Sequence, residues 1–202
     1  MKNKRIMFAP VKEYEDRLEV KHSRFIGGIY PVDSVHQAEE KIQSVRRVHS
    51  GADHHCWAYR LQTDSGISSR SSDEGEPSGT AGRPILESLE EKDIVDAILL
   101  VSRFFGGIKL GMGGLSRAYR ACARQVIAGC ALKEKLELKQ ISLTFNYASE
   151  SGMRRLLATM NGVLIQTDYT DKVLWRISLP SEAIDQFLAK SIDICSGEIK
   201  YI

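Results

Sequence analysis

Hydrophobic residues along the chain recur with two spacings, every second residue and every third to fourth residue, which are the spacings of strands and helices. In the first two thirds of the chain the spacing changes at glycine, proline, serine and acidic residues, which favour turns and helix ends. Residues 95–102 are apolar almost throughout, so we expect a strand buried on both faces. The spacings predict, in chain order, a strand pair over 13–32 broken at Gly27–Gly28, a helix over 35–48, a strand over 54–61, a loop over 66–82, a helix over 84–92, a strand over 95–102 and a helix over 115–131.

The last third of the chain carries the clearest pattern. Alternating strands and amphipathic helices follow one another in the order β-α-β-β-α-β from Ile141 to Tyr201, which is the ferredoxin-like motif. The charged stretch Lys133–Glu137 separates this pattern from the preceding helix. It predicts two domains, residues 1–134 and 135–202, and the fold class α+β.

Composition and charge narrow the classes of function only a little. Of 202 residues, 43% are hydrophobic, 28 are Lys or Arg and 26 are Asp or Glu, so the net charge is +2. These values exclude a disordered chain and a strongly basic nucleic-acid binder, but they do not exclude a local basic surface. No apolar run approaches the roughly 18 residues that span a membrane, and four scattered cysteines without a C-x-x-C pair indicate reduced thiols. We therefore expect a soluble cytoplasmic protein with no membrane partner.

A glycine-rich loop and the helix behind it, residues 103–124, form the most informative local feature. Glycines let a ligand approach the backbone closely, and the start of a helix presents unpaired N–H donors to an anion. No acidic residue lies between Leu99 and Arg124, so the segment is basic and fits contact with phosphate groups. The candidate contacts are Arg103, Gly106, Gly107, Lys109, Gly113, Gly114 and the three arginines of one helix face, Arg117, Arg120 and Arg124.

The spacing of these glycines leaves a second interpretation open. Gly106 and Gly111 are separated as in a phosphate-binding P-loop, but Met112–Gly113 stands where that motif needs Lys followed by Ser or Thr. The alternative is a turn followed by an ordinary helix whose basic face is only solvated.

The acidic loop at residues 72–84 is the second feature. Its carboxylates Asp73, Glu74 and Glu76 fit three uses: holding a divalent cation such as Mg²⁺, facing solvent, or pairing with nearby arginines. His54 and His55 precede the loop, but neighbouring residues of a strand point to opposite faces, so a shared zinc site is not expected. We expect His54 to be packed or hydrogen-bonded, and the chain to use no metal and no cofactor.

Four motifs in a fixed order give the chain a resemblance to a known family. They are Lys21-His22-Ser23-Arg24-Phe25, Asp53 to Tyr59, Ser72 to Pro84, and Arg103-Phe104-Phe105-Gly106-Gly107 continuing to Gly111-Met112-Gly113-Gly114-Leu115. The chain resembles the IMPACT family and its bacterial, YigZ-type members, although His22 stands where the family often has Lys. The resemblance implies an N-terminal α/β domain like that of ribosomal proteins and of domain IV of elongation factor G, followed by a ferredoxin-like domain. Eukaryotic members regulate translation, so it also implies a role in translation.

The leading hypothesis is a translation-associated regulator, not an enzyme, that binds RNA, the ribosome or a translation factor through the basic loop and helix. Arg24 and His54 join the candidate contacts named above. A metal-assisted hydrolase or phosphotransferase is the first alternative, with the acidic loop holding the cation and His54 or His55 acting as acid or base. A protein–protein adaptor is the second alternative, with Phe104, Phe105 and Leu110 as its apolar patch. The oligomeric state is left open.

Overall fold

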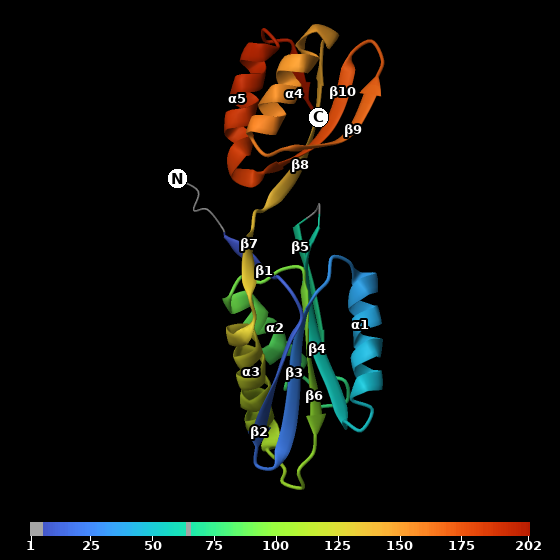
Figure 1. The fold of residues 1–202 in the computed structure, drawn as a ribbon, viewed down its shortest axis with the longest axis vertical. Coiled ribbons are helices and arrows are strands. Elements are labelled where there is room, and N and C mark those ends of the chain that lie inside the picture. The colour runs from blue at the N-terminus through green and yellow to red at the C-terminus, as the bar shows by residue number, and fades with distance from the viewer. Residues whose placement is uncertain (1–5, 64–65) are drawn as a thin grey trace. The chain divides into compact units, whose positions relative to one another are not determined.

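An antiparallel sheet of five strands forms the centre of residues 6–135, in the order β2-β3-β6-β4-β5 (Figure 1). The structure is a computed structural model and describes residues 6–63 and 66–202, which divide into two units, residues 6–135 and 136–202. Residues 1–5 of the first expected domain lie outside the described residues. The five strands are β2 (Tyr14–Val20), β3 (Ser23–Pro31), β4 (His54–Thr63), β5 (Gly66–Ser72) and β6 (Ala97–Phe104).

Helices cover both faces of this sheet (Figure 1). α1 (Val35–Val48) lies over one face, while α2 (Gly82–Glu91) and α3 (Gly111–Gly129) lie over the other. The central strand β6 is buried from Ala97 to Arg103 because both of its faces are covered, which confirms the predicted buried strand. The hydroxyl of Ser34 caps the start of α1 by accepting the backbone N–H of Gln37.

The predicted break at Gly27–Gly28 is wrong, because the chain turns at Lys21–His22 between β2 and β3. Gly27 lies inside β3 and faces α3, where a Cβ atom would come within 2.8 Å of the side chains of Cys122 and Val126. The close approach of helix and strand therefore requires this glycine, and no turn is involved.

The predicted loop over residues 66–82 is too long. Gly66–Ser72 forms β5, which pairs with β4 at the edge of the sheet. Most of its side chains are serines that are exposed or half-buried, so no apolar alternation marks the strand. Backbone hydrogen bonds to β4 hold it in the sheet, and the loop itself spans only residues 73–81.

The helix that follows the glycine-rich segment begins four residues earlier than predicted, at Gly111 and not at Leu115. Gly113 and Gly114 belong to the first turn of α3, so the loop between β6 and α3 spans residues 105–110. After α3, part of the charged stretch forms β7 (Leu132–Lys135), which pairs antiparallel with β1 (Met7–Pro10).

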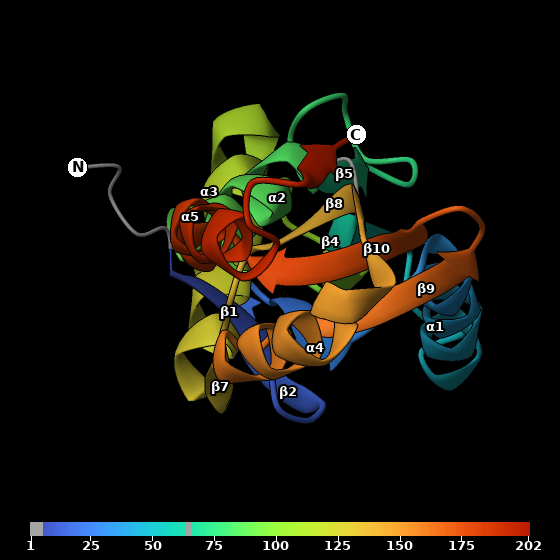
Figure 2. The same ribbon diagram turned by 90° about the horizontal axis from the view of Figure 1, so that it is seen from above.

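Residues 136–202 form a second antiparallel sheet with α4 (Glu150–Thr159) and α5 (Ile184–Ile194) side by side on one face (Figure 2). The order of elements confirms the predicted ferredoxin-like motif, with Trp175 fully buried at its centre. Its strands, in the sheet order β11-β8-β10-β9, are β11 (Ile199–Tyr201), β8 (Leu138–Phe145), β10 (Val173–Pro180) and β9 (Val163–Tyr169). In the described part of the chain, no helix has the length and apolar character needed to cross a membrane.

Candidate functional site

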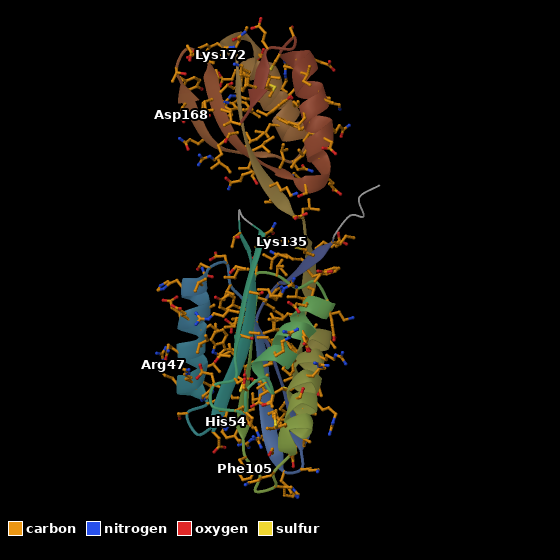
Figure 3. All side chains as sticks on the ribbon, turned by 180° about the vertical axis from the view of Figure 1, so that it is seen from behind. Arg47, His54, Phe105, Lys135, Asp168 and Lys172 are labelled. Carbon is orange, nitrogen blue, oxygen red and sulfur yellow. The ribbon has the colours of Figure 1, made fainter. Side chains whose placement is uncertain are left out.

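Four segments that contain residues of the four sequence motifs meet at one end of the five-stranded sheet. We call this end of the sheet the loop end. Arg103 of β6 pairs with Phe25 of β3 on one side and with His54 of β4 on the other, so the register brings these segments together. Figure 3 shows His54 and Phe105 at this same end. The four segments are the turn Lys21–His22, residues 53–55 at the start of β4, the loop 73–81 and the loop 105–110.

The loop 105–110 is fixed at its start by the chain's own polar groups. The backbone N–H of Phe105 donates to the Asp53 carboxylate at 2.8 Å, and that of Gly106 donates to the Ser23 hydroxyl at 3.2 Å. A Cβ atom on Gly106 would lie 2.0 Å from the backbone carbon of His22. The close approach predicted at Gly106 is therefore made by the chain itself and not by a ligand. Gly107 is open and has a φ of +86°.

Arg103, a predicted ligand contact, is instead buried beneath the loop end. Its guanidinium donates to the Glu76 carboxylate at 2.8 Å, and the two side chains are only 7% and 3% exposed. The hydroxyl of Tyr119 donates to the same Glu76 oxygen at 2.8 Å. The prediction for Arg103 is corrected, because a buried and ion-paired guanidinium does not reach an external phosphate. Pairing with arginine, one of the three uses considered for the acidic loop, is the one seen for Glu76.

Burial sets the ionisation of the other groups around this ion pair. It raises the pKa of Tyr119 far above the ordinary value of a phenol, so this side chain stays a neutral donor. Burial also raises the pKa of Cys56 to about 12, and its thiol donates to the Asp73 carbonyl at 2.9 Å. Neither group is an activated nucleophile at neutral pH.

Asp73 and Glu74 point to separate sets of partners. The Asp73 carboxylate accepts the backbone N–H groups of Gly79, Ala81 and Gly82 at 2.8–2.9 Å, so it caps the start of α2. Burial opposes ionisation of Asp73, but these three hydrogen bonds lower its pKa below the ordinary value. Glu74 accepts hydrogen bonds from Arg46 and from the indole N–H of Trp57.

The described residues, 6–63 and 66–202, contain no group of three or more His, Cys, Asp or Glu side chains arranged to hold a metal ion. His54 Nδ1 lies 3.0 Å from the Glu74 carbonyl, whereas His55 Nδ1 lies 2.9 Å from the Ser102 hydroxyl. Burial, with a contribution from nearby Arg46, lowers the pKa of His55. The metal-assisted alternative therefore finds no assembled cation site in this part of the chain, and His54 is hydrogen-bonded as expected.

The predicted basic face of α3 is largely neutralised by α2. Arg120 pairs with Glu87, and Arg124 makes a two-pronged contact with Glu91 at 2.8–3.0 Å. Each glutamate precedes its arginine by 33 residues, so counting acids along residues 99–124 missed both. Arg120 and Arg124 are four residues apart, and so are Glu87 and Glu91. This shared spacing, which places each pair on one helix face, is the sequence signal that could have predicted the two ion pairs.

Three predicted cations remain exposed at the loop end. Within the described residues, no ion pair is formed by Arg24, Lys109 or Arg117. The Arg24 guanidinium lies 4.5 Å from the centre of the Phe104 ring, which leaves its charge uncompensated. Arg117 lies beside Gly113, since a Cβ atom there would come 3.4 Å from its Nη1.

Apolar side chains accompany these cations. Phe105, Ile108 and Met112 are 47%, 44% and 62% exposed, and only Phe105 belongs to the patch predicted from the sequence. Phe104 and Leu110, the other members of the predicted patch, are half-buried. The exposed surface of the loop end is thus both basic and apolar.

Comparison with known proteins covers both units of the chain. Residues 21–127 match the model of the Impact N-terminal domain, and residues 143–198 match a domain of unknown function, DUF1949. The chain is 35% identical to the IMPACT family member YigZ of Escherichia coli (strain K12), covering 96% of this chain and 94% of that protein. It is 30% identical to the IMPACT family member YvyE of Bacillus subtilis (strain 168), covering 93% and 89%.

A solved structure resembles the whole chain. It is described as the crystal structure of an hypothetical protein, has a TM-score of 0.72 and 33% sequence identity, and covers 98% of this chain and 96% of that one. The likeness therefore extends over both units and does not rest on a short shared motif.

Proposed function

The chain belongs to the IMPACT family, and from this premise we propose that it regulates translation by binding RNA at the loop end. The observation that carries the proposal is the difference between two sets of basic residues. Arg103, Arg120 and Arg124 are paired with acids, whereas Arg24, Lys109 and Arg117 are exposed and unpaired among the described residues. Folding thus leaves cations at the loop end that have no acidic partner among the described residues.

The chemistry of this surface fits single-stranded or looped RNA. Exposed lysine and arginine neutralise phosphates and release counterions, which supplies affinity without reading sequence. Unstacked bases of RNA stack on aromatic side chains, and the half-exposed ring of Phe105 offers such a surface next to the cations. Gly107, whose positive φ favours glycine, places no side chain at its own point of the loop.

The ferredoxin-like unit offers a weaker surface for RNA. Related sheets that bind RNA place aromatic side chains on the sheet face that the helices leave open. In residues 136–202, all of which are described, the central strands β8 and β10 place no aromatic side chain on that face. The residues there are Gln140, Ser142, Thr144, Leu174, Arg176 and Ser178.

A protein partner is the second candidate, favoured by a specific observation. Phe105, Ile108 and Met112 are all exposed at the loop end, and exposed apolar side chains that gather there fit a protein interface. The two candidates differ in the interaction on which they depend, because RNA binding needs the cations whereas an apolar interface does not.

Two charge-matched variants test the proposal. K109Q/R117Q removes two unpaired charges, and R120Q/R124Q removes two paired ones, so both variants change the net charge equally. With a labelled single-stranded RNA at about 50 mM salt, we expect the first variant to bind at least tenfold more weakly and the second to bind like the wild type. Absence of binding by the wild type, or equal weakening by both variants, overturns the proposal.

The protein-partner candidate makes a separate prediction for the same proteins. Crosslinking in cells followed by identification of the captured molecules is expected to recover RNA with the wild type and much less with K109Q/R117Q. Recovery of one protein with both, and its loss with F105A/M112A, would support the apolar interface instead.

A further inference from the structure

We propose that the turn Lys21–His22 is a phosphate-binding element of the loop end, so that RNA is held by the turn as well as by the loop before α3. This inference rests on the proposed function and adds two contacts to it. Neither residue belongs to the set of exposed cations, Arg24, Lys109 and Arg117, on which the proposed RNA site is built. The turn between β2 and β3 lies beside the loop leading to α3 in Figure 1.

The backbone of this turn is unfavourable for the residues that occupy it. Val20 pairs with Ser23, so only Lys21 and His22 connect the two strands, and their φ values are +47° and +63°. A two-residue connection with both φ values positive is a type I′ turn, in which Asn-Gly or Asp-Gly is preferred. A side chain with a Cβ atom is strained in this conformation, so Lys and His each destabilise the turn.

The fold provides no compensation for this strain. Both side chains are exposed, and neither makes a hydrogen bond, ion pair or ring contact with any other described residue. A residue pair chosen only for folding would be Asn-Gly, which removes the strain and gives up no interaction within the chain. The presence of Lys and His therefore points to a use of their side chains outside the chain itself.

The turn is continuous with the exposed cations already described. Gly106 packs against the His22 backbone, and its N–H donates to Ser23 at 3.2 Å, so the turn supports the loop that carries Lys109. Two acids lie close to this junction in the strand register and in the hydrogen bonds, Asp53 and Glu19. Asp53 accepts the N–H of Phe105, and Glu19, the cross-strand neighbour of Arg24, makes no ion pair with it in the described part of the chain.

The turn, the start of β3 and the loop thus adjoin one another at the loop end, and each of these segments carries a cation. Lysine acts as a point charge for phosphate, and the two ring nitrogens of histidine offer a hydrogen-bond donor even when the ring is neutral. A chain of phosphodiesters presents phosphates at regular intervals and engages several such groups together. A run of RNA phosphates crossing the turn and the loop is the ligand that this arrangement fits.

The test uses the full chain and separates strain from charge. K21N/H22G relieves the strain and removes both side chains, whereas K21Q/H22Q removes the Lys21 charge and the His22 ring and keeps the strain. S196G is the matched control, because Ser196 has a φ of +50° in residues 136–202 and its replacement relieves strain far from the turn in sequence. Each protein is measured by thermal unfolding and by titration with a labelled single-stranded RNA at several salt concentrations.

We expect K21N/H22G to unfold at a temperature higher by about 2–8 °C and yet to bind RNA at least tenfold more weakly. K21Q/H22Q is expected to bind as weakly without that gain in stability, and S196G to bind like the wild type. For both turn variants the slope of log K against log salt should fall by about 0.7 for each phosphate that the turn no longer neutralises.

Wild-type affinity and slope in K21N/H22G and K21Q/H22Q would overturn the inference. If K109Q/R117Q weakens binding while the turn variants do not, the inference fails and the proposed function stands. If the wild-type chain binds no RNA, both fail together.

Discussion

Gly106 and Gly113 lie in the same glycine-rich segment but have different surroundings. A Cβ atom on Gly106 would be 2.0 Å from the His22 backbone, whereas on Gly113 it would meet only the flexible end of Arg117 at 3.4 Å. We predict that G106A lowers the free energy of unfolding by about 1–3 kcal/mol, because backbone cannot yield to the added methyl. G113A, inside the first turn of α3, is expected to raise it by up to about 1 kcal/mol. Urea unfolding of both variants checks this, and equal effects would contradict the assigned packing.

The buried pair of Arg103 and Glu76 gives the second prediction. Removing one partner leaves an uncompensated buried charge, so R103M is expected to lower the free energy of unfolding by about 3–5 kcal/mol. The double variant E76L/R103M should recover much of that loss, since no charge is then left unpaired. Denaturant unfolding measures both. A loss in the double variant larger than that in R103M would show that the pair is not the reason for the cost.

Whether a residue is buried or exposed could be predicted only where a local sequence pattern determines it. The nearly continuous apolar run over residues 95–102 predicts a strand buried on both faces, but it does not show that Arg103, the next residue, is buried as well. Its partner Glu76 comes from a loop 27 residues away, so no local pattern shows that the inward charge is satisfied. Arg103 therefore reads as a ligand contact in sequence and as an internal ion pair in the fold.

At the scale of elements, Asp73 holds the start of α2. Because it accepts three backbone N–H groups, we expect D73A to lower the free energy of unfolding by about 0.5–2 kcal/mol at pH 7. D193A removes an exposed carboxylate from α5 and serves as a control that should change stability little. Chemical denaturation at fixed pH compares the two variants, and equal effects would contradict the cap.

The same carboxylate gives a pH dependence whose sign is fixed. The pKa of Asp73 in the folded chain lies below its ordinary value of 3.8, so its ionised form favours the folded state. The stabilisation is therefore complete above pH 3.8 and is lost as the pH falls through the lower, folded-state pKa. The difference in stability between wild type and D73A should shrink over that acidic range. A difference that stays constant down to the acid unfolding of the chain would contradict this role.

Helices and strands with a clear pattern of apolar residues were predicted well. An edge strand and the contacts between two helices were not. α1 and the whole ferredoxin-like motif follow from the spacing of apolar residues, and β6 follows from its nearly continuous apolar run. β5 was missed because an edge strand of serines needs only backbone pairing to β4. The pairing of α3 with α2 was missed because it joins charges from two helices whose packing no local pattern shows.

At the scale of the whole molecule, the two units each have a hydrophobic core of their own. We predict that fragments 1–135 and 136–202 fold separately, since few contacts are expected to cross a domain boundary. Each contains one of the two tryptophans, Trp57 and Trp175, so fluorescence reports on the folding of each fragment. RNA binding should stay with fragment 1–135. Binding by fragment 136–202 alone would contradict placement of the site at the loop end.

The most direct measurement for the loop end is the salt dependence of RNA binding by the full chain. If Lys109 and Arg117 neutralise phosphates, log K should fall linearly with log salt, and K109Q/R117Q should lower the slope by about 0.7 for each contact on a single strand. R120Q/R124Q, whose charges are already paired with α2, should keep the wild-type slope. A wild-type chain that binds no RNA at about 50 mM salt, or a slope unchanged in K109Q/R117Q, would contradict RNA binding at this surface.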